Sequence, residues 1–414
     1  MMRGYSFRLI PTKQQEEYFW KASNAARYIY NWTLAEKKRL YSEQGLNLSG
    51  YEMCKLLTQL KKQPDHQWLN EIHNKVLKKS VLDCNEAFER MFKGKSRFPR
   101  FKSKKNTTPS FYIETSIENK GMEILDGGTI KDKGLSKIKF NYKNQVQLSG
   151  IGWVQLSKNA KQYKLWYLTE NLIPVCNGRI KFDGEHWNLT FSLDIPKKKK
   201  QLTDEIIGID LGVKDTAICS NGEIYKNINK TSEHIKTLEK RKKKYQKQIS
   251  KKYETNKEVN VDTGKAKYIK TNNIKKLEQK VYKIDRKLKN IRKTYNHQIS
   301  REIVNQNPKA IVMEDLNIKG MMKNKHLSKA IQQQHLYQLK TFIKYKAENQ
   351  GSNFIEVPRN YKSTQICSRC GAVHKMNLSQ RVYKCDVCGH IEDRDMNSAH
   401  NLENYGKIYY LHSK

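Results

Sequence analysis

The chain has 414 residues, enough for two to four domains, and its 80 lysines and arginines against 41 acids give a formal net charge of +39. This excess predicts a polyanionic partner, because each neutralised phosphate releases condensed counterions. A basic surface without a ligand is the alternative, although 23 Tyr, 12 Phe and 6 Trp supply rings that can stack on bases. The sequence contains no run of 18 apolar residues and no signal peptide, so we expect a cytoplasmic protein without a membrane partner.

The N-terminal part of the chain predicts a short strand over residues 1–10 and a helical lobe over residues 11–105. Thr12 and Gln15 have capping-box spacing at the start of the first helix. That helix is rich in aromatic residues, most of them expected in a core and a few as stacking platforms for bases: Tyr18, Phe19, Trp20, Tyr28, Tyr30 and Trp32. The segment 95–105 alternates cations with phenylalanines, which suits a nucleic-acid backbone or, alternatively, a solvated loop.

Residues 106–200 change to short apolar runs that are separated by Gly, Asn and Asp. This pattern predicts a small antiparallel β-barrel, wedge-like in position, to which residues 1–10 add the first strand. Strands are expected at 111–113, 138–140, 153–156 and 189–193, and Pro196 with the lysines 197–200 forms a charged linker.

Residues 201–360 predict an α/β domain. A buried strand at 206–210 is followed by a strand at 216–219 and by Asn221-Gly222, the signal of a type I′ hairpin. Further strands are expected at 309–314 and 353–357, with a helix at about 329–349 between them. Three antiparallel strands followed by alternating helices and strands is the order of the RNase H fold.

A long helical hairpin is predicted at 231–305 within this domain. Apolar residues step by four and three along its second half, which forms a heptad seam: Leu277, Val281, Ile284, Leu288, Ile291 and Tyr295. The opposite face consists almost wholly of lysine and arginine, so a coiled coil with a solvated face and a polyanion-binding face are both compatible with it. The polar join at about 259–272 is expected to be mobile, and a short helix at 397–405 closes the domain.

Asp210 and Glu314 end apolar strands and Asp395 opens a helix, so each carboxylate can leave the core at the edge of a sheet. Three clustered carboxylates repel one another unless cations lie between them. Two Mg²⁺ ions, or Mn²⁺, would relieve this repulsion and support hydrolysis of a phosphodiester, with Asp210 bridging both ions and Glu314 and Asp395 holding one each. Other roles are expected for three neighbouring acids: Asp315 points elsewhere, Asp393 caps a helix or forms an ion pair, and Asp215 caps a turn.

Cys367 and Cys370 form one Cys-x-x-Cys knuckle and Cys385 and Cys388 form another, with a glycine after each. This spacing predicts a structural Cys₄ zinc ribbon over residues 361–392, and two disulfides are the alternative. Nearby cations suggest that the ribbon also contacts nucleic acid: Arg369, Lys375, Arg381 and Lys384. The other cysteines are scattered and are expected to be reduced thiols: Cys54, Cys84, Cys176 and Cys219.

The residues resemble the TnpB (OrfB) family, the transposon-encoded RNA-guided nucleases related to type V CRISPR effectors. The resemblance runs nearly end to end and rests on 5–12, Tyr30-Asn31-Trp32, 98–102, 208–212, 312–317, the ribbon and 393–399. One departure is Ser398, which stands where the family usually has alanine.

The resemblance implies a RuvC-like nuclease domain over 201–360 with the zinc ribbon inserted, completed by a final segment and tail at 393–414. It also implies a guide RNA from the transposon end, double-stranded target DNA cut beside a short motif, and a monomeric ribonucleoprotein in a bacterial or archaeal cytoplasm, associated with the nucleoid when bound. The intact acids Asp210, Glu314 and Asp395 favour a nuclease over a guided DNA binder that does not cut.

Two other functions stay open. A transposase or transposition accessory protein would use the same acids for strand transfer, and a miniature type V CRISPR effector would differ only in its genomic neighbourhood. The guide sequence, the target-adjacent motif and its reader residues, the cut positions, the oligomeric state and the role in the host do not follow from the sequence.

Overall fold

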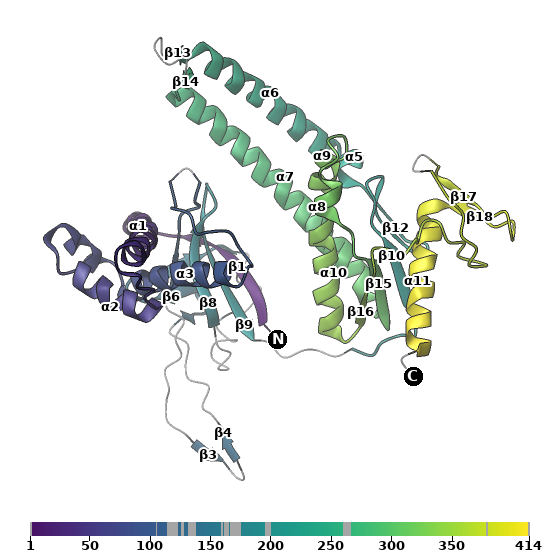
Figure 1. The fold of residues 1–414 in the computed structure, drawn as a ribbon, viewed down its shortest axis with the longest axis horizontal. Coiled ribbons are helices and arrows are strands. Elements are labelled where there is room, and N and C mark those ends of the chain that lie inside the picture. Colours follow the sequence, from purple (N-terminus) through teal and green to yellow (C-terminus); the bar gives the residue numbers. More distant parts are fainter. Residues whose placement is uncertain are drawn as a thin grey trace. The chain divides into compact units, whose positions relative to one another are not determined.

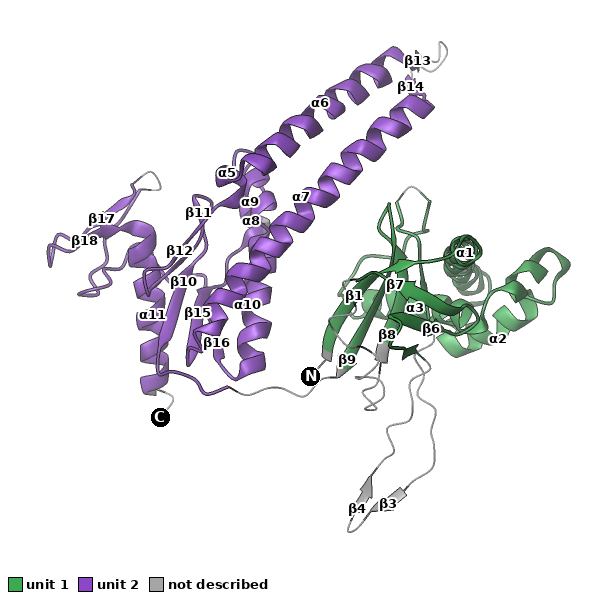
Figure 2. Ribbon diagram, turned by 180° about the vertical axis from the view of Figure 1, so that it is seen from behind, with its two compact units in different colours: residues 1–196 green, residues 197–414 purple. Residues whose placement is uncertain are grey.

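The computed structural model describes residues 2–104, 106–113, 123–125, 128–130, 138–158, 160, 165, 175–194, 200–259, 266–377 and 380–412. The chain divides into two compact units, Met1–Pro196 and Lys197–Lys414 (Figure 2). Most of the expected linker at 197–200 lies outside the described residues.

The first unit begins with strand β1 (Met2–Ile10) and the 32-residue helix α1 (Lys13–Gln44). The predicted capping box is confirmed, because Gln15 N donates to Thr12 Oγ1 at 3.3 Å and Thr12 N donates to Gln15 Oε1 at 3.1 Å. Gly45, with φ of 67°, ends the helix in the left-handed conformation that glycine adopts without cost. The lobe continues through α2 (Gly50–Leu60), a 3₁₀ helix (Pro64–Glu71) and α3 (Asn74–Phe92).

The aromatic residues of α1 divide between core and surface, as expected. Phe19 and Tyr30 are buried, whereas the side chains of Trp20 and Tyr28 are 37% and 39% exposed. Phe19 packs against Trp187 of the sheet with ring centroids 5.4 Å apart. This contact joins the helices of the first unit to its sheet in one core.

The sheet of the first unit has seven strands in the order β2-β8-β9-β1-β7-β6-β5, and all neighbouring pairs are antiparallel. The segment 1–10 lies at its middle as β1, where residues 2–8 pair with β9 and residues 9–10 pair with β7. The described strands are β2 (Ser110–Tyr112), β5 (Lys139–Phe140), β6 (Gln145–Leu148), β7 (Gly152–Leu156), β8 (Val175–Phe182) and β9 (Trp187–Asp194). A separate small hairpin comprises β3 (Glu123–Leu125) and β4 (Gly128–Ile130).

The second unit is built on a five-stranded sheet of order β12-β11-β10-β15-β16. Its strands are β10 (Ile206–Asp210), β11 (Asp215–Cys219), β12 (Ile224–Lys226), β15 (Ala310–Glu314) and β16 (Asn353–Val357). The pairs β10–β11 and β11–β12 are antiparallel, whereas the pairs β10–β15 and β15–β16 are parallel. The carboxyl ends of β10 and β15 therefore meet at one edge of the sheet.

Helices cover both faces of this sheet (Figure 1). On one face, α7 (Asn272–Asn305) and α10 (Leu336–Gln350) pack on Ile207, Ile209 and Met313. On the other, α11 (Arg394–His412) packs on Val312 through Leu402. Because side chains alternate along a strand, Asp210 and Glu314 belong to the α11 face, on which α11 begins with Arg394 and Asp395.

The predicted helical hairpin consists of α6 (Glu233–Thr255) and α7, which pack through Ile235, Leu238, Ile284 and Leu288. Leu277, Val281 and Ile291, the other predicted seam residues before Tyr295, are half-buried, so the heptad pattern does mark the contact face. Within the expected mobile join, residues 260–265 lie outside the described residues, and two short strands flank them: β13 (Lys257–Val259) and β14 (Ala266–Tyr268).

Three local expectations for the second unit were wrong. Of Asn221 and Gly222, only Gly222 has a positive φ, of 91°, so the turn is not type I′, which needs two. The expected helix at 329–349 is broken at His335, whose φ is 53°, into α9 (Ser328–Gln334) and α10. The closing helix runs to His412 rather than Tyr405, because Tyr405 and Tyr410 pack on the sheet and extend the apolar face. Two single-turn helices complete the unit, α5 (Ile228–Thr231) and α8 (Ile318–Met321).

Gly208 lets α11 approach β10 closely. A Cβ at this position would lie 2.1 Å from the backbone oxygen of Ala399 and 2.5 Å from the backbone nitrogen of Glu403. We expect Gly208→Ala to lower the free energy of unfolding by about 3 kcal/mol or more, because helix backbone cannot yield as a flexible side chain would. Urea unfolding would measure this, with Gly4→Ala as control, since nothing lies within 4 Å of that position. Equal stability of the two variants would contradict the close packing.

Candidate active site and metal centre

The three predicted acids lie together at the edge of the second sheet, at the ends of β10 and β15 and the start of α11. The carboxylates of Glu314 and Asp395 are close enough to act electrostatically on Asp210. Within the described parts of the chain, however, these acids do not form a group whose ligand atoms all lie within 4.8 Å of one another. The arrangement is that of mutually repelling carboxylates, which divalent cations would draw closer.

Burial, and then the charges of Glu314 and Asp395, raise the pKa of Asp210 from 3.8 to about 8. The folded pKa lies above the unfolded one, so the native state holds this proton between about pH 4 and pH 8 and loses stability as pH rises through that window. We expect Asp210→Asn to stabilise the metal-free protein by about 2–4 kcal/mol at pH 7. Thermal unfolding in EDTA should show that the stability of the variant exceeds that of wild type by more at pH 8 than at pH 5. A variant less stable than wild type at pH 8 would contradict this prediction.

Glu314 is held by two buried serines. Ser363 Oγ donates a short hydrogen bond to Glu314 Oε1, and Ser398 Oγ donates to Ser363 Oγ at 2.9 Å. Burial raises the pKa of Glu314, and the Ser363 hydroxyl opposes that rise. Ser398, the residue at which this sequence departs from the family pattern, thus occupies a buried position with a hydrogen-bond partner.

We expect Ser363→Ala to weaken the binding of Mg²⁺ at these acids about tenfold, because a buried carboxylate without its donor is less firmly oriented. Isothermal titration calorimetry with Mg²⁺ would measure this. Ser363→Thr keeps the hydroxyl and serves as the matched control. An unchanged affinity for Mg²⁺ in the alanine variant would contradict the role of this hydrogen bond.

Two arginines approach Asp395. Arg394 Nη2 lies 3.0 Å from Asp395 Oδ1, and Arg381 Nη1 lies 3.7 Å from Oδ2. Arg381 belongs to the ribbon, and its guanidinium reaches a carboxylate of the candidate active site; its expected contact with nucleic acid stays a prediction.

The neighbouring acids have separate partners. Asp315 is paired with Arg359 at 2.7 Å and with Lys340 at 3.4 Å, so it does point elsewhere. Asp393 Oδ1 accepts from the backbone nitrogen of Asp395 at 2.9 Å, as a helix cap does. The expectation for Asp215 was wrong: it is a buried residue of β11, paired with Lys226 at 3.3 Å, rather than a turn cap.

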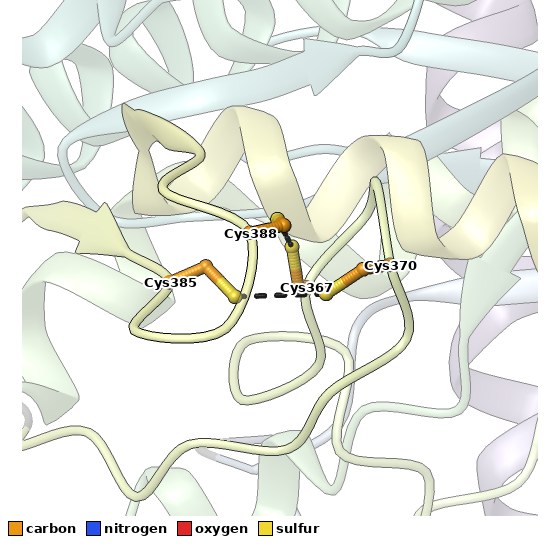
Figure 3. Close-up of side chains that lie close together, drawn as sticks. All are labelled: Cys367, Cys370, Cys385 and Cys388. Atoms are coloured by element: carbon orange, nitrogen blue, oxygen red, sulfur yellow. Dashed lines mark hydrogen bonds between the residues drawn. The ribbon is translucent and has the colours of Figure 1, made fainter.

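The four predicted cysteine ligands converge on one point (Figure 3). The Sγ atoms of Cys367, Cys370, Cys385 and Cys388 all lie within 4.8 Å of one another. The Cys367–Cys388 and Cys370–Cys385 sulfur distances are both 3.6 Å. This is far longer than the roughly 2.05 Å of a disulfide and close to the roughly 3.8 Å edge of a tetrahedron with Zn–S bonds of about 2.3 Å. The cluster is therefore compatible with a structural zinc ion.

Hydrogen bonds favour a thiolate at Cys385. Burial acts to raise its pKa, but hydrogen bonds from the backbone N–H groups of Cys388 and Val387, together with those from the Cys370 and Cys388 thiols, outweigh burial and lower the pKa to about 6. Gly371 and Gly389, with φ of 78° and 70°, form the turns after the knuckles in a conformation that strains other residues. The strands β17 (Val382–Lys384) and β18 (Ile391–Asp393) carry the second knuckle.

The arm that leads into the ribbon, residues 361–368, is fastened to α11. Asn401 Nδ2 donates to the carbonyl oxygens of Ser363 and Ile366 at 2.8 and 2.6 Å. Asn397 donates to Ile366 O at 2.8 Å and accepts from Ser368 N at 2.9 Å. Both asparagines are buried, so the arm that carries Ser363 is fixed to the helix that carries Asp395.

Sequence reasoning missed Ser363 and Lys340. Lys340 is only 8% exposed, pairs with Asp315 and Glu356, and donates to the backbone oxygen of Glu314 at 3.2 Å, which fixes the end of β15. Neither residue stands in a sequence motif, because each contacts Glu314 from a distant part of the chain. The one signal in the sequence was that Lys340 lies on the apolar face of its helix.

Comparison with known proteins agrees with these features. The OrfB IS605 "Probable transposase" family matches residues 190–325, its "Helix-turn-helix domain" matches residues 1–45, and the "Cas12f1-like, TNB domain" matches residues 337–402, which include the first knuckle and the cysteines of the second. A "Putative RNA-guided DNA endonuclease" of Streptomyces pristinaespiralis is 24% identical over 97% of this chain and 88% of its own length. The chain belongs to the TnpB (OrfB) family.

Other relatives extend the comparison. "Putative RNA-guided DNA endonuclease InsQ" of Escherichia coli is 24% identical over 97% of this chain and 91% of its own length. The "CRISPR-associated endodeoxyribonuclease Cas12f1" of Sulfoacidibacillus thermotolerans is 38% identical over 28% of each chain. Among solved structures, one of a Cas12f1–sgRNA–target DNA complex superimposes with a TM-score of 0.58 at 14% identity and covers 98% of this chain and 99% of that one. The TnpB chain therefore shares the fold of that effector.

The name of the N-terminal family domain does not describe its structure in this TnpB chain. Residues 1–45 form β1 and one uninterrupted helix, because α1 contains neither glycine nor proline at which a helix-turn-helix could bend. Of the helices that the structure describes, none combines the length and hydropathy needed to span a bilayer.

Proposed function

We propose that this TnpB protein is an RNA-guided DNA endonuclease that cuts double-stranded target DNA beside a short motif. The observation that carries the proposal is the gathering of Asp210, Glu314 and Asp395 at the carboxyl edge of the second sheet, in a chain that matches relatives named RNA-guided DNA endonucleases over nearly its whole length. The net charge of +39 suits a protein that holds both a guide RNA and its DNA target.

In this proposal the second unit is an RNase H-like, RuvC-type nuclease domain. The strand order β12-β11-β10-β15-β16, with antiparallel pairs before parallel ones, supports the assignment. We assign residues 201–360 to this domain, 361–392 to its zinc ribbon and 393–414 to its last segment. In the first unit, 11–105 is the helical lobe, and 1–10 with 106–200 is the barrel.

Two Mg²⁺ or Mn²⁺ ions would supply Lewis acidity for the hydrolysis of the phosphodiester. Asp210, whose carboxyl group lies close enough to the other two acids for their charges to act on it, would hold these ions together with Glu314 and Asp395. Ser363 orients Glu314 through its hydroxyl, and Lys340 fixes the end of the strand that carries it. Zn²⁺ would bind Cys367, Cys370, Cys385 and Cys388 with a structural role, since four thiolates leave no open ligand position.

Sequencing the RNA that co-purifies with the protein tests the proposal. A discrete RNA with a variable 3′ segment matching the outer flank of the transposon would supply the guide for a cleavage assay with Mg²⁺. Only random RNA, or none, together with no guided cleavage, would overturn the proposal.

A second candidate is a transposase, which the description "Probable transposase" of the matching family favours. It would join transposon ends to target DNA without RNA, so a strand-transfer assay on those ends separates the two functions. A miniature type V CRISPR effector would behave as the endonuclease does in both assays, and a CRISPR array beside the gene would identify it.

A further inference from the structure

A polar pocket lies in the first unit, far along the chain from the carboxylates. Its wall consists of Arg27 from α1, Asp83 from α3, Lys102 from the basic segment and Arg179 from β8, together with hydroxyl side chains of α1, α3 and residues 107–110. The pocket is open to solvent, and the space in it that the centre of a water-sized sphere can occupy is about 30 Å³, more than the roughly 10–15 Å³ that holds one water. All these residues belong to one compact unit.

The charges in this pocket do not cancel. Asp83 is its one lining acid and is already paired, with Arg179 Nη2 at 2.8 Å and with Lys79 Nζ at 3.4 Å. For Arg27 and Lys102, no described acid lies within ion-pair distance. These two cations in a concave, hydroxyl-lined wall therefore have no ion-pair partner among the described residues of the first unit, and a partly desolvated cation is stabilised when an anion joins it.

Lys102 is held in place by hydrogen bonds to its backbone and by an aromatic ring. Asn31 makes two hydrogen bonds with the Lys102 backbone: Asn31 Nδ2 donates to its carbonyl oxygen at 2.9 Å, and Asn31 Oδ1 accepts from its nitrogen at 2.7 Å. Its Nζ lies 3.5 Å from the ring centroid of Tyr30. Burial lowers the pKa of Lys102, and the charge of Asp83 opposes this only in part. The lysine is thus presented to the pocket in a fixed position.

We propose that this pocket binds one phosphodiester group of a nucleic-acid backbone, with Arg27 and Lys102 as its cations and the Asp83-paired Arg179 as a further donor. The inference rests on the proposed function for the identity of the polyanion. The phosphate comes from the guide RNA or from the target DNA; both present the same chemistry to the pocket. Such a contact fixes the register of the bound strand and carries no sequence information of its own.

Two variants of the full-length protein test the pocket. Lys102→Met keeps the aliphatic stem beside Tyr30 and the backbone bonds to Asn31, and Arg27→Gln keeps a polar side chain on α1. Arg39→Gln is the matched control, because Arg39 lies on the same helix and is paired with both Glu36 and Glu43 at 2.6 Å. Thermal unfolding of each variant would establish that it is folded.

Binding is measured in two arms over a range of salt concentrations: guide RNA to the protein alone, and target DNA to the guide-loaded protein. We expect each pocket variant to bind about tenfold more weakly in one arm, as when one charge-assisted contact is lost. The slope of log affinity against log salt should fall by about 0.7 for a single strand or about 0.9 for a duplex. The arm that changes identifies the source of the phosphate.

The pocket proposal would be wrong if the wild type binds normally and both variants keep its affinity and salt slope in both arms. The proposed function would not be affected by that result. Weaker binding with an unchanged salt slope would overturn the pocket proposal too, because the loss would then not come from a phosphate contact. A wild-type protein that binds neither nucleic acid would overturn the proposed function and the pocket with it.

Discussion

An Asp210→Ala variant is expected to lose cleavage of guide-matched DNA by at least about a thousandfold, while its guided DNA binding stays within about twofold of wild type. Asp210 ends the central strand β10, and the charges of both other acids act on its carboxyl group, so its loss removes a ligand that those two acids cannot replace. Its removal also takes away a carboxyl group whose burial, and then the charges of Glu314 and Asp395, raise its pKa to about 8, so the variant should fold at least as well as wild type. Loss of activity would then not reflect unfolding.

The measurement is single-turnover cleavage of labelled duplex with Mg²⁺, together with an equilibrium binding assay on the same preparation. Asp204→Ala is the control, because Asp204 is fully exposed near the start of the same strand. Loss of DNA binding in the Asp210 variant would contradict the two-metal assignment, as would cleavage close to wild type.

The second large effect is expected from Cys385→Ser. Cys385 is buried and is one of the four sulfur ligands that the cluster offers, so a serine there leaves the zinc site with three cysteines. The free energy of binding of a structural zinc ion, about 10–16 kcal/mol in small domains, is what folds them. We expect the variant to lose its zinc, to expose the ribbon to protease and to cleave DNA at least about a hundredfold more slowly.

The loss of cleavage is expected because the ribbon and the carboxylates are joined. The arm at 361–368 carries Ser363, which donates to Glu314, and Arg381 of the ribbon reaches Asp395. Metal analysis, limited proteolysis and cleavage would be compared with Cys54→Ser, a cysteine outside the cluster. Full zinc content in the Cys385 variant would refute that ligand, and normal cleavage without zinc would refute the coupling.

Features that depend on local pattern could be predicted from the sequence. Strand periodicity was enough to expect Asp210 and Glu314 at strand ends, and knuckle spacing was enough to bring four cysteines together. The capping box at Thr12 is equally local. In each case the signal lies within a few residues of the feature, so no knowledge of the tertiary structure is needed.

Features that depend on contacts between distant parts of the chain could not be predicted from the sequence. Ser363 reaches Glu314 only because a buried face of α11 holds the arm in place, and no spacing in the sequence indicates this. Asp215 resembled a turn cap because it follows a glycine-containing loop, yet pairing with β12 draws it into the sheet. The break at His335 follows neither proline nor glycine, so propensity alone predicts one continuous helix.

The fastening of residues 361–368 to α11 also sets where this chain can be shortened or recombined. A module boundary drawn at the first knuckle would leave Ser363 with the nuclease, whereas one drawn at the end of β16 would remove it. Anyone who inserts foreign sequence into this scaffold, or trims it, should therefore do so between Gly371 and Arg381, which leaves all four zinc ligands in the chain. That choice keeps the asparagine-anchored arm with the scaffold and places the seam in solvent-exposed chain.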